Sequence, residues 1–179
     1  MDYTEKVIRH VNRYEGVIVQ VDMEMVKVPN GNITMREVVR HPGGVCVVAL
    51  DGDGMVAMVR QYRFPIGEHL LELPAGKLEP GEEPLPAAKR ELSEETGLEA
   101  DEWRDLGFIY TSPGFSTERL YLYLATGLHH GAQHLDLNEF LDVEYHSLES
   151  LRDMVLRGEI ADGKTVAGVL KTAALAKED

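Results

Sequence analysis

The stretch GKLEPGEEPLPAAKRELSEETGL, residues 76–98, decides the fold. It begins in a Pro/Gly-rich loop and continues over residues 86–96 with strong helix formers, which predict a helix there. Gly97 follows as a natural stop, because glycine readily adopts the left-handed conformation that ends many helices. The stretch therefore predicts a loop followed by one helix.

Three glutamates share one face of this predicted helix. Glu91 lies three residues before Glu94 and four before Glu95, so the three side chains project from neighbouring positions. Like charges at this spacing destabilise an isolated helix and raise each other's pKa, which favours a neutralising cation. Hard oxygen ligands suit Mg²⁺ or Mn²⁺. An acidic helix face exposed to water explains the spacing alone equally well.

Outward from this helix, apolar and β-branched runs predict strands, and apolar residues at helical spacing predict two helices near the C-terminus. Such a mixture of strands and helices predicts an α/β or α+β fold, with a mixed sheet sandwiched between helices. The expected strands are 45–50, 55–60, 69–73, 105–110, 119–125 and 140–146, and the expected helices run from 148 to about 157 and from Asp162 to about 177.

The first 41 residues are predicted to form a separate β subdomain. Strands are expected over 16–21, 23–28 and 33–41, with a hairpin turn at Asn30-Gly31. So small a sheet is not stable alone, so it must pack on its own domain or on a partner chain. The expected organisation is an N-terminal subdomain over 1–41 and a main domain over 42–179.

Composition narrows the function classes. The 179 residues include 18 Lys and Arg against 31 Asp and Glu, a net charge of −13, which disfavours binding to nucleic acid and anionic membranes. No apolar run approaches the ~20 residues of a membrane helix, and the N-terminus lacks an apolar signal core. With a single cysteine, no intrachain disulfide can form. The expected compartment is the cytoplasm.

The pattern G-x₅-E-x₇-R-E-L-x-E-E-x-G-L over 76–98 resembles the Nudix box, the signature of the Nudix hydrolase family. The resemblance implies an α/β/α sandwich and Mg²⁺-dependent hydrolysis of a nucleoside diphosphate linked to another moiety, with Mn²⁺ as a possible substitute. It also implies roles for individual residues. The implied metal ligands are Glu91, Glu94, Glu95 and the backbone carbonyl of Ala75, while Gly76 and Gly97 hold the loop and the helix end, and Glu82 and Arg90 brace the site.

The segments VRQYRFPIGEHLLELPAGKLEPGE (59–82) and YTSPGFSTE (110–118) are similar to the ADP-ribose pyrophosphatase branch of that family. The branch implies hydrolysis of ADP-ribose to AMP and ribose 5-phosphate, in a homodimer whose exchanged N-terminal strands contribute to the partner's active site. A broader nucleoside-diphosphate-sugar hydrolase, acting for example on ADP-glucose or GDP-mannose, is an alternative; a non-catalytic ADP-ribose-binding sensor is a remote one. The positions that match substrate-binding residues are Arg36, Glu37, Arg63, Ser112, Pro113, Gly114 and Glu118.

One loop departs from the branch, which commonly carries an acidic run before its last strand. Here the loop has Asp136, Leu137 and Glu139. Glu139 matches an acid that helps to bind metal in relatives, while Leu137 stands where the usual catalytic base would be. Glu139, Asp136 or metal-activated water alone could then supply the base function. The resulting expectation is a catalytic set of Glu139, Glu94 and Arg90, with Glu139 also a metal ligand.

Overall fold

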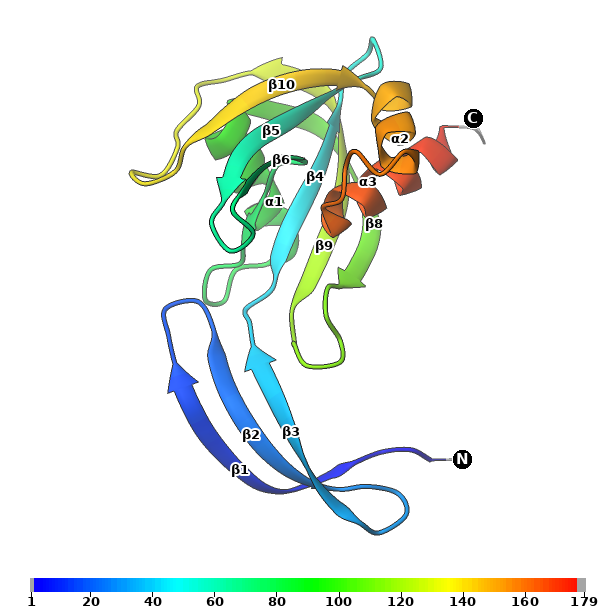
Figure 1. Ribbon diagram of the computed structural model, residues 1–179. Helices are drawn as coiled ribbons and strands as arrows, with labels where there is room; N and C mark the ends of the chain where they lie inside the picture. Colours follow the sequence, from blue (N-terminus) through cyan, green and yellow to red (C-terminus); the bar gives the residue numbers. More distant parts are fainter. Residues whose placement is uncertain (1, 177–179) are drawn as a thin grey trace. The chain divides into compact units, whose positions relative to one another are not determined.

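The computed structural model describes residues 2–176, which divide into two compact units. One unit contains the chain up to Gly43 together with Tyr110–Arg119, and the other contains Gly44–Ile109 and the chain from Leu120 onward. Figure 1 labels the elements in chain order. They are β1 (Lys6–Glu15), β2 (Gln20–Lys27), β3 (Ile33–Arg40), β4 (Gly44–Leu50), β5 (Met55–Arg63), β6 (Glu68–Glu72), β7 (Ala75–Lys77), α1 (Pro84–Thr96), β8 (Leu98–Tyr110), β9 (Arg119–His130), β10 (Leu141–Ser147), α2 (Leu148–Leu156) and α3 (Gly163–Leu175).

The smaller unit is a three-stranded antiparallel sheet in the order β1-β2-β3. The predicted turn between β2 and β3 is present: Gly31 has a φ of 92°, and its N–H donates to the Val28 carbonyl at 2.9 Å. The segment Tyr110–Arg119 joins this sheet, because Val39 and Phe115 pair through a 2.7 Å backbone hydrogen bond. The antiparallel N-terminal sheet expected from the sequence is confirmed.

The boundaries of the first strands were predicted wrongly. The turn falls at Gly16–Val19, closed by a 2.9 Å backbone hydrogen bond, and the preceding Lys6–Glu15 forms a strand that the sequence did not indicate. Two register shifts interrupt β1, between Val7 and Arg9 and between Asn12 and Tyr14. Such bulges break the two-residue alternation on which strand prediction depends.

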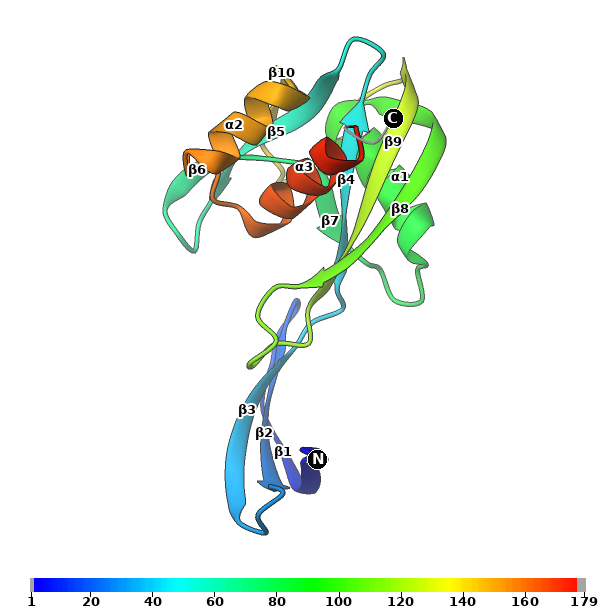
Figure 2. The same cartoon turned by 90° about the vertical axis from the view of Figure 1, so that its right-hand side faces the viewer.

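The larger unit is an α/β/α sandwich. Its main sheet has the order β10-β5-β4-β9-β8, with β6 beside β5 and β7 beside β4; β4 and β9 are parallel and the other registered pairs are antiparallel. Helix α1 covers one face of this sheet, and α2 and α3 cover the other; Figure 2 shows both layers from the side. This arrangement confirms the predicted mixed sheet between helices.

Strand β4 is the centre of the core because both of its faces are covered. Val45 and Val47 pack in one cluster with Leu92 of α1, while Val48 packs in the other cluster with Val169 of α3. All five side chains are buried. A strand buried on both faces reads as a continuous apolar run, which is why the sequence located it correctly.

Three strands of this unit are longer than predicted. β5 ends at Arg63 rather than at residue 60. β8 begins at Leu98, directly after α1, rather than at residue 105, and β9 continues to His130 rather than ending at 125. The added part of β8 is rich in exposed charged residues, so its apolar signal is weak. The last predicted helix is present as α3, and its expected end near residue 177 lies outside the described residues. Within the described chain, no helix is both long and apolar enough to cross a membrane.

Candidate active site

The three glutamates of α1 lie along the side of the helix that meets β7. Glu95 is 1% exposed, whereas the side chains of Glu91 and Glu94 are 14% and 38% exposed. The buried position of Glu95 follows from the helical repeat, because Ala88 and Leu92 lie on the same face and pack into the core. A carboxylate at the end of this apolar stripe cannot reach bulk water.

Strand β7 supplies the other side of the site. The Ala75 N–H donates to Oε2 of Glu95 at 2.9 Å, which anchors that carboxylate. A Cβ atom on Gly76 would lie 2.0–2.3 Å from the carboxylate atoms of Glu91, closer than any real contact. Glycine at position 76 is therefore a steric requirement for the placement of the Glu91 carboxylate.

Arg90 and Glu82 brace the cluster. Arg90 forms two hydrogen bonds to Glu82, from Nε at 3.0 Å and from Nη2 at 2.9 Å. Its Nη1 donates to Glu91 at 2.8 Å and to Glu94 at 2.9 Å. A planar guanidinium held along one edge by a carboxylate has a fixed direction, so Arg90 orients two glutamates at once.

The loop after β9 closes the C-terminal end of α1. Gly97 has a φ of 69° and ends the helix, and its carbonyl accepts a 2.6 Å hydrogen bond from the Gly131 N–H. Gln133 Nε2 donates to the Glu95 carbonyl at 2.6 Å, and the His134 N–H donates to the Glu94 carbonyl at 3.0 Å. These bonds satisfy carbonyls that a helix end leaves without intrahelical partners. The sequence did not indicate this role for the loop.

The same loop brings Glu139 into the electrostatic range of the α1 carboxylates. Burial, with a smaller contribution from the charges of Glu139 and Glu91, raises the pKa of Glu95 to about 8. The pKa of Glu91 is also raised, first by burial and then by the charges of Glu94 and Glu139. In contrast, Leu137 is 93% exposed and Asp136 is also exposed.

This donor set fits a hard divalent cation. The carboxylates of Glu91, Glu95 and Glu139 lie within electrostatic range of one another. Burial together with mutual repulsion disfavours the charged forms of Glu91 and Glu95, so a bound cation would relieve both costs. The residues that could hold it are Glu91, Glu94, Glu95 and Glu139, with the carbonyl of Ala75 on β7.

Arg63, at the end of β5, belongs to a second charged group in this unit. Its Nε and Nη2 each donate to Glu72 at 2.7 Å, and Lys164 of α3 donates to the same carboxylate. Lys164 also donates to Asp162 at 2.9 Å. Sequence reasoning singled out Arg63, expected Asp162 only as the start of the last helix, and missed Glu72 and Lys164. An acidic residue at the end of the apolar run HLLEL (69–73) was the available signal.

The remaining residues expected to bind substrate belong to the smaller unit. Arg36 is paired with Glu5 through Nη2 at 2.7 Å, and Glu37 is exposed on the same strand. Glu118 accepts a 2.5 Å hydrogen bond from Thr111. Ser112, Pro113 and Gly114 form the turn that precedes it, in which the Ser112 carbonyl accepts hydrogen bonds from the next residues of the loop.

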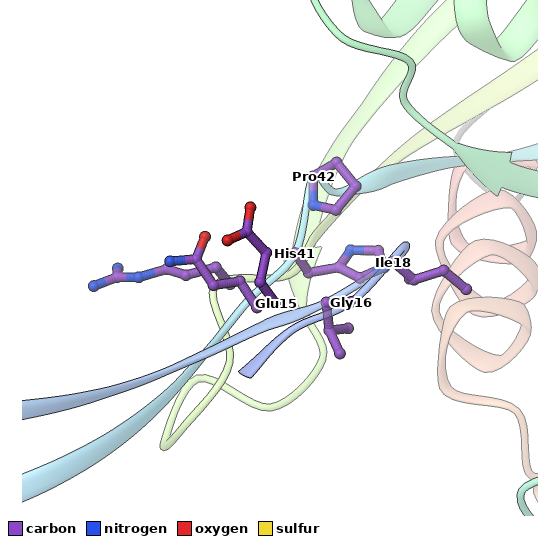
Figure 3. A pocket seen from close by; sticks show the side chains of 8 residues that line it. Glu15, Gly16, Ile18, His41 and Pro42 are labelled. Atoms are coloured by element: carbon purple, nitrogen blue, oxygen red, sulfur yellow. The ribbon is translucent and has the colours of Figure 1, made fainter. Parts of the chain in front are cut away.

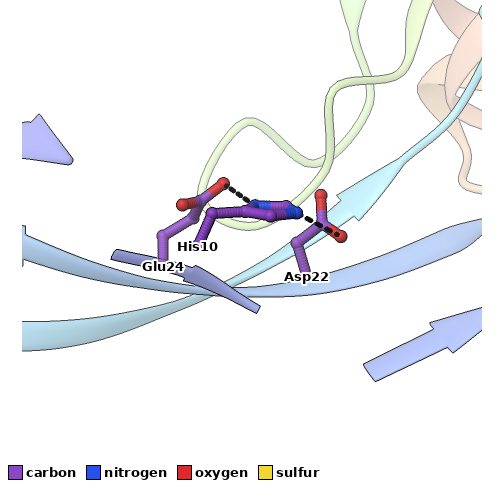
Figure 4. Close-up of side chains that lie close together, drawn as sticks. All are labelled: His10, Asp22 and Glu24. Atoms are coloured by element: carbon purple, nitrogen blue, oxygen red, sulfur yellow. Dashed lines mark hydrogen bonds and ion pairs between the residues drawn. The ribbon is translucent and has the colours of Figure 1, made fainter. Parts of the chain in front are cut away.

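The smaller unit contains two further features. One is a pocket of about 270 Å³. Its lining includes Ile18 and His41, which are labelled in Figure 3. Figure 4 shows His10 between Asp22 and Glu24, three residues whose ligand atoms lie within 4.8 Å of one another. Arg40 of the same sheet already pairs with both carboxylates, at 2.9 and 2.7 Å. The cluster is therefore an ion-pair network.

The raised pKa of Glu95 predicts how the metal-free protein responds to pH. Between about pH 5 and 8, folded Glu95 holds a proton that unfolded Glu95 has lost, so the free energy of unfolding should fall as pH rises through this window. Glu95→Gln should remove most of that slope, while Glu79→Gln at an exposed position should retain it. Denaturant titrations in a chelator check this. An equal stability of the wild type at pH 5 and pH 8 would contradict it.

Comparisons with known proteins agree with this geometry. Residues 40–168 match the model of the NUDIX domain. The chain is 41% identical to a methanol dehydrogenase activator of Bacillus methanolicus, over 93% of this chain and 91% of that protein. It is 40% identical to an ADP-ribose pyrophosphatase of Bacillus subtilis, over 92% of this chain and 90% of that one.

A solved structure of an ADP compounds hydrolase has the same fold, with a TM-score of 0.85 over 97% of this chain and 95% of that one, at 19% identity. The family match covers the whole carboxylate site and most of the sandwich around it. The chain belongs to the Nudix hydrolase family.

Proposed function

We propose that the protein hydrolyses the pyrophosphate bond of ADP-ribose, giving AMP and ribose 5-phosphate, with Mg²⁺ as the metal and Mn²⁺ as a substitute. The observation that carries the proposal is the carboxylate cluster of α1 gathered against Gly76, where one glutamate is fully buried. Identity of 40% to an ADP-ribose pyrophosphatase over nine-tenths of both chains supports the choice of substrate. Nudix enzymes of that kind are generally dependent on divalent metals.

The residues then have distinct tasks. Glu91, Glu94, Glu95 and Glu139 hold the cation, which when bound neutralises charge and polarises phosphoryl oxygens. Arg90 keeps two of the glutamates in position. Arg63 offers guanidinium donors to the diphosphate, since its planar fork matches phosphate oxygens.

Glu139 is proposed as the base that takes the proton of the attacking water. It is half-buried, and its charge acts on both Glu91 and Glu95, so it lies within the electrostatic range of the cluster. Leu137 cannot accept a proton. Among the described residues, no hydrogen bond or ion pair holds the carboxylate of Asp136 in place. The backbone carbonyl of Asp136 instead accepts the Glu139 N–H at 2.9 Å.

A homodimer with exchanged N-terminal strands is proposed as the assembly, and the cytoplasm as the compartment. Support for the dimer comes from apolar side chains left exposed on the small sheet, among them Val7, Tyr14 and Ile33 at 57–61% exposure. Exposed apolar groups on one sheet are typical of surfaces that pack on a partner. The N-terminal subdomain over 1–41, carrying Arg36 and Glu37, would then serve substrate binding in the assembly.

Two alternatives remain testable. Because Leu137 departs from the usual pattern of this loop, the first alternative is a hydrolase that acts on a broader range of nucleoside diphosphate sugars. The 41% identity to a methanol dehydrogenase activator favours a second candidate function, stimulation of such a dehydrogenase, which an assay of dehydrogenase rate with and without this chain would reveal.

Turnover of a substrate panel tests the main proposal. With Mg²⁺, ADP-ribose should be cleaved faster than ADP-glucose and GDP-mannose, and mass spectrometry should identify AMP and ribose 5-phosphate. Glu91→Gln and Glu95→Gln should each lower kcat by more than about 100-fold. Even the loss of a residue that only hydrogen-bonds to a metal ligand costs about 10–100-fold in activity. Glu149→Gln on α2, across the sheet, is the matched control. Failure to cleave any of these compounds with Mg²⁺ or Mn²⁺ would refute the proposal.

The role of the 136–139 loop is tested separately. Glu139→Gln should lower kcat by at least about 10²-fold, the usual contribution of a general base, whereas Asp136→Asn should cost less than about tenfold. Raising the pH should recover activity if Glu139 is the base, and raising Mn²⁺ should do so if it is only a ligand. Wild-type rates in both variants would show that the loop takes no part in the chemistry.

A further inference from the structure

A buried ionic network lies on the face of the sheet that carries α3. Glu72 is 1% exposed and Lys164 is 9% exposed, so both charges are almost completely removed from water. Lys164 donates to Glu72 and to Asp162, and Glu72 accepts both hydrogen bonds from Arg63. The four side chains carry two positive and two negative charges, so the network is neutral as a whole.

Both buried groups are charged at neutral pH. Burial acts to raise the pKa of Glu72, but the hydrogen bond from Arg63 and the charge of Lys164 outweigh it, so the pKa is lowered. Burial acts to lower the pKa of Lys164, but Asp162 and Glu72 outweigh it, so this pKa is raised.

Stability alone is a weak reason to keep such a network. Apolar side chains of similar volume often replace a buried ion pair without loss of stability, because the desolvation of two charges offsets their attraction. What apolar groups cannot do is hold the guanidinium of Arg63 by two parallel hydrogen bonds. The network is therefore best explained by what it does to Arg63.

Glu72 accepts only some of the hydrogen bonds that the Arg63 guanidinium can donate. A guanidinium has five N–H donors, and Glu72 engages one at Nε and one at Nη2. The other donors, two at Nη1 and one at Nη2, lie along its remaining edges, and the side chain is 39% exposed. A guanidinium fixed along one edge and partly open to solvent presents a set direction to an incoming anion.

The start of α3 fixes Glu72 through two contacts. Besides the bond from Lys164, Oγ1 of Thr165 accepts a 2.9 Å hydrogen bond from the N–H of Leu73, the residue after Glu72. Asp162 caps the helix by accepting from the Thr165 N–H at 3.0 Å. Lys164 thus connects a capped, rigid helix end to the carboxylate that orients Arg63.

We propose that Lys164 is a positioning residue for diphosphate binding, acting through Glu72 to hold Arg63 in its binding direction. The inference rests on the proposed function, in which Arg63 meets the diphosphate. Without Lys164, two carboxylates would face one guanidinium, and the local charge would become −1, which repels an anion. Loss of Lys164 should therefore weaken binding of the diphosphate rather than slow the chemical step.

The test measures binding and turnover of Lys164→Met. Its Kd for ADP-ribose in a chelator, where no metal-dependent turnover interferes, should rise at least about tenfold, as should KM with Mg²⁺, because the excess negative charge repels the diphosphate and Arg63 loses its fixed direction. Its kcat should stay within about threefold of the wild type. Lys171→Met removes the same charge from the same helix away from Glu72, and should leave both constants unchanged.

A double variant, Glu72→Gln with Lys164→Met, keeps the inference falsifiable if the single variant is unstable. It restores neutrality between Arg63 and Asp162, so the fold should recover, but Arg63 loses its paired charged acceptor and Kd and KM should stay high. Wild-type Kd and KM in this double variant, or a fall in kcat with unchanged KM in Lys164→Met, would overturn the inference. Hydrolysis of ADP-ribose by the wild-type protein, measured in the same series, tests the proposed function separately. The Kd comparison does not depend on hydrolysis, so the two failures can be told apart.

Discussion

The constraint on which the site depends is the burial of carboxylates on one face of α1, to which their mutual repulsion adds. Glu95 is buried with its pKa raised to about 8, and Glu91 beside it is also shifted upward. The surrounding structure accommodates this cost: Gly76 leaves room for one carboxylate, and Arg90, itself held by Glu82, pairs with its neighbours. Such an arrangement is unfavourable without a cation and favourable with one, which is the behaviour expected of a metal-binding helix.

The short segment of residues 72–75 makes a contact with a charged side chain at each end. At its start, Glu72 holds the guanidinium of Arg63, and at its end Ala75 donates to the carboxylate of Glu95. Between them, the Pro74 carbonyl accepts from the Val47 N–H at 2.9 Å, which ties the segment to the central strand. A short segment tied down in this way holds the Arg63 guanidinium and the carboxylate of Glu95 at a constant separation, which is what the proposed binding of a diphosphate beside the carboxylates needs.

Much of this could be predicted from the sequence, and the misses have physical causes. The spacing of Glu91 and Glu95 placed both on one face of a predicted helix, and only the resemblance to the Nudix box favoured a metal site over a solvated face. The continuous apolar run of β4 located the centre of the sheet. Bulges hid the strand Lys6–Glu15, since they break its alternation. The partners of Arg63 were missed because Lys164 is distant from it along the chain, and only the fold brings α3 against β6. The steric reason for Gly76 likewise depends on a neighbour fifteen positions away.

Calorimetry of Mn²⁺ binding, in buffers of different ionisation enthalpy at pH 7, tests the central claim most directly. A cation that replaces the proton on Glu95 must release it, so the wild type should bind the ion with release of close to one proton. Glu95→Gln should bind more weakly and release little. Binding of the wild type with no proton release at pH 7, or no binding at all, would contradict the account.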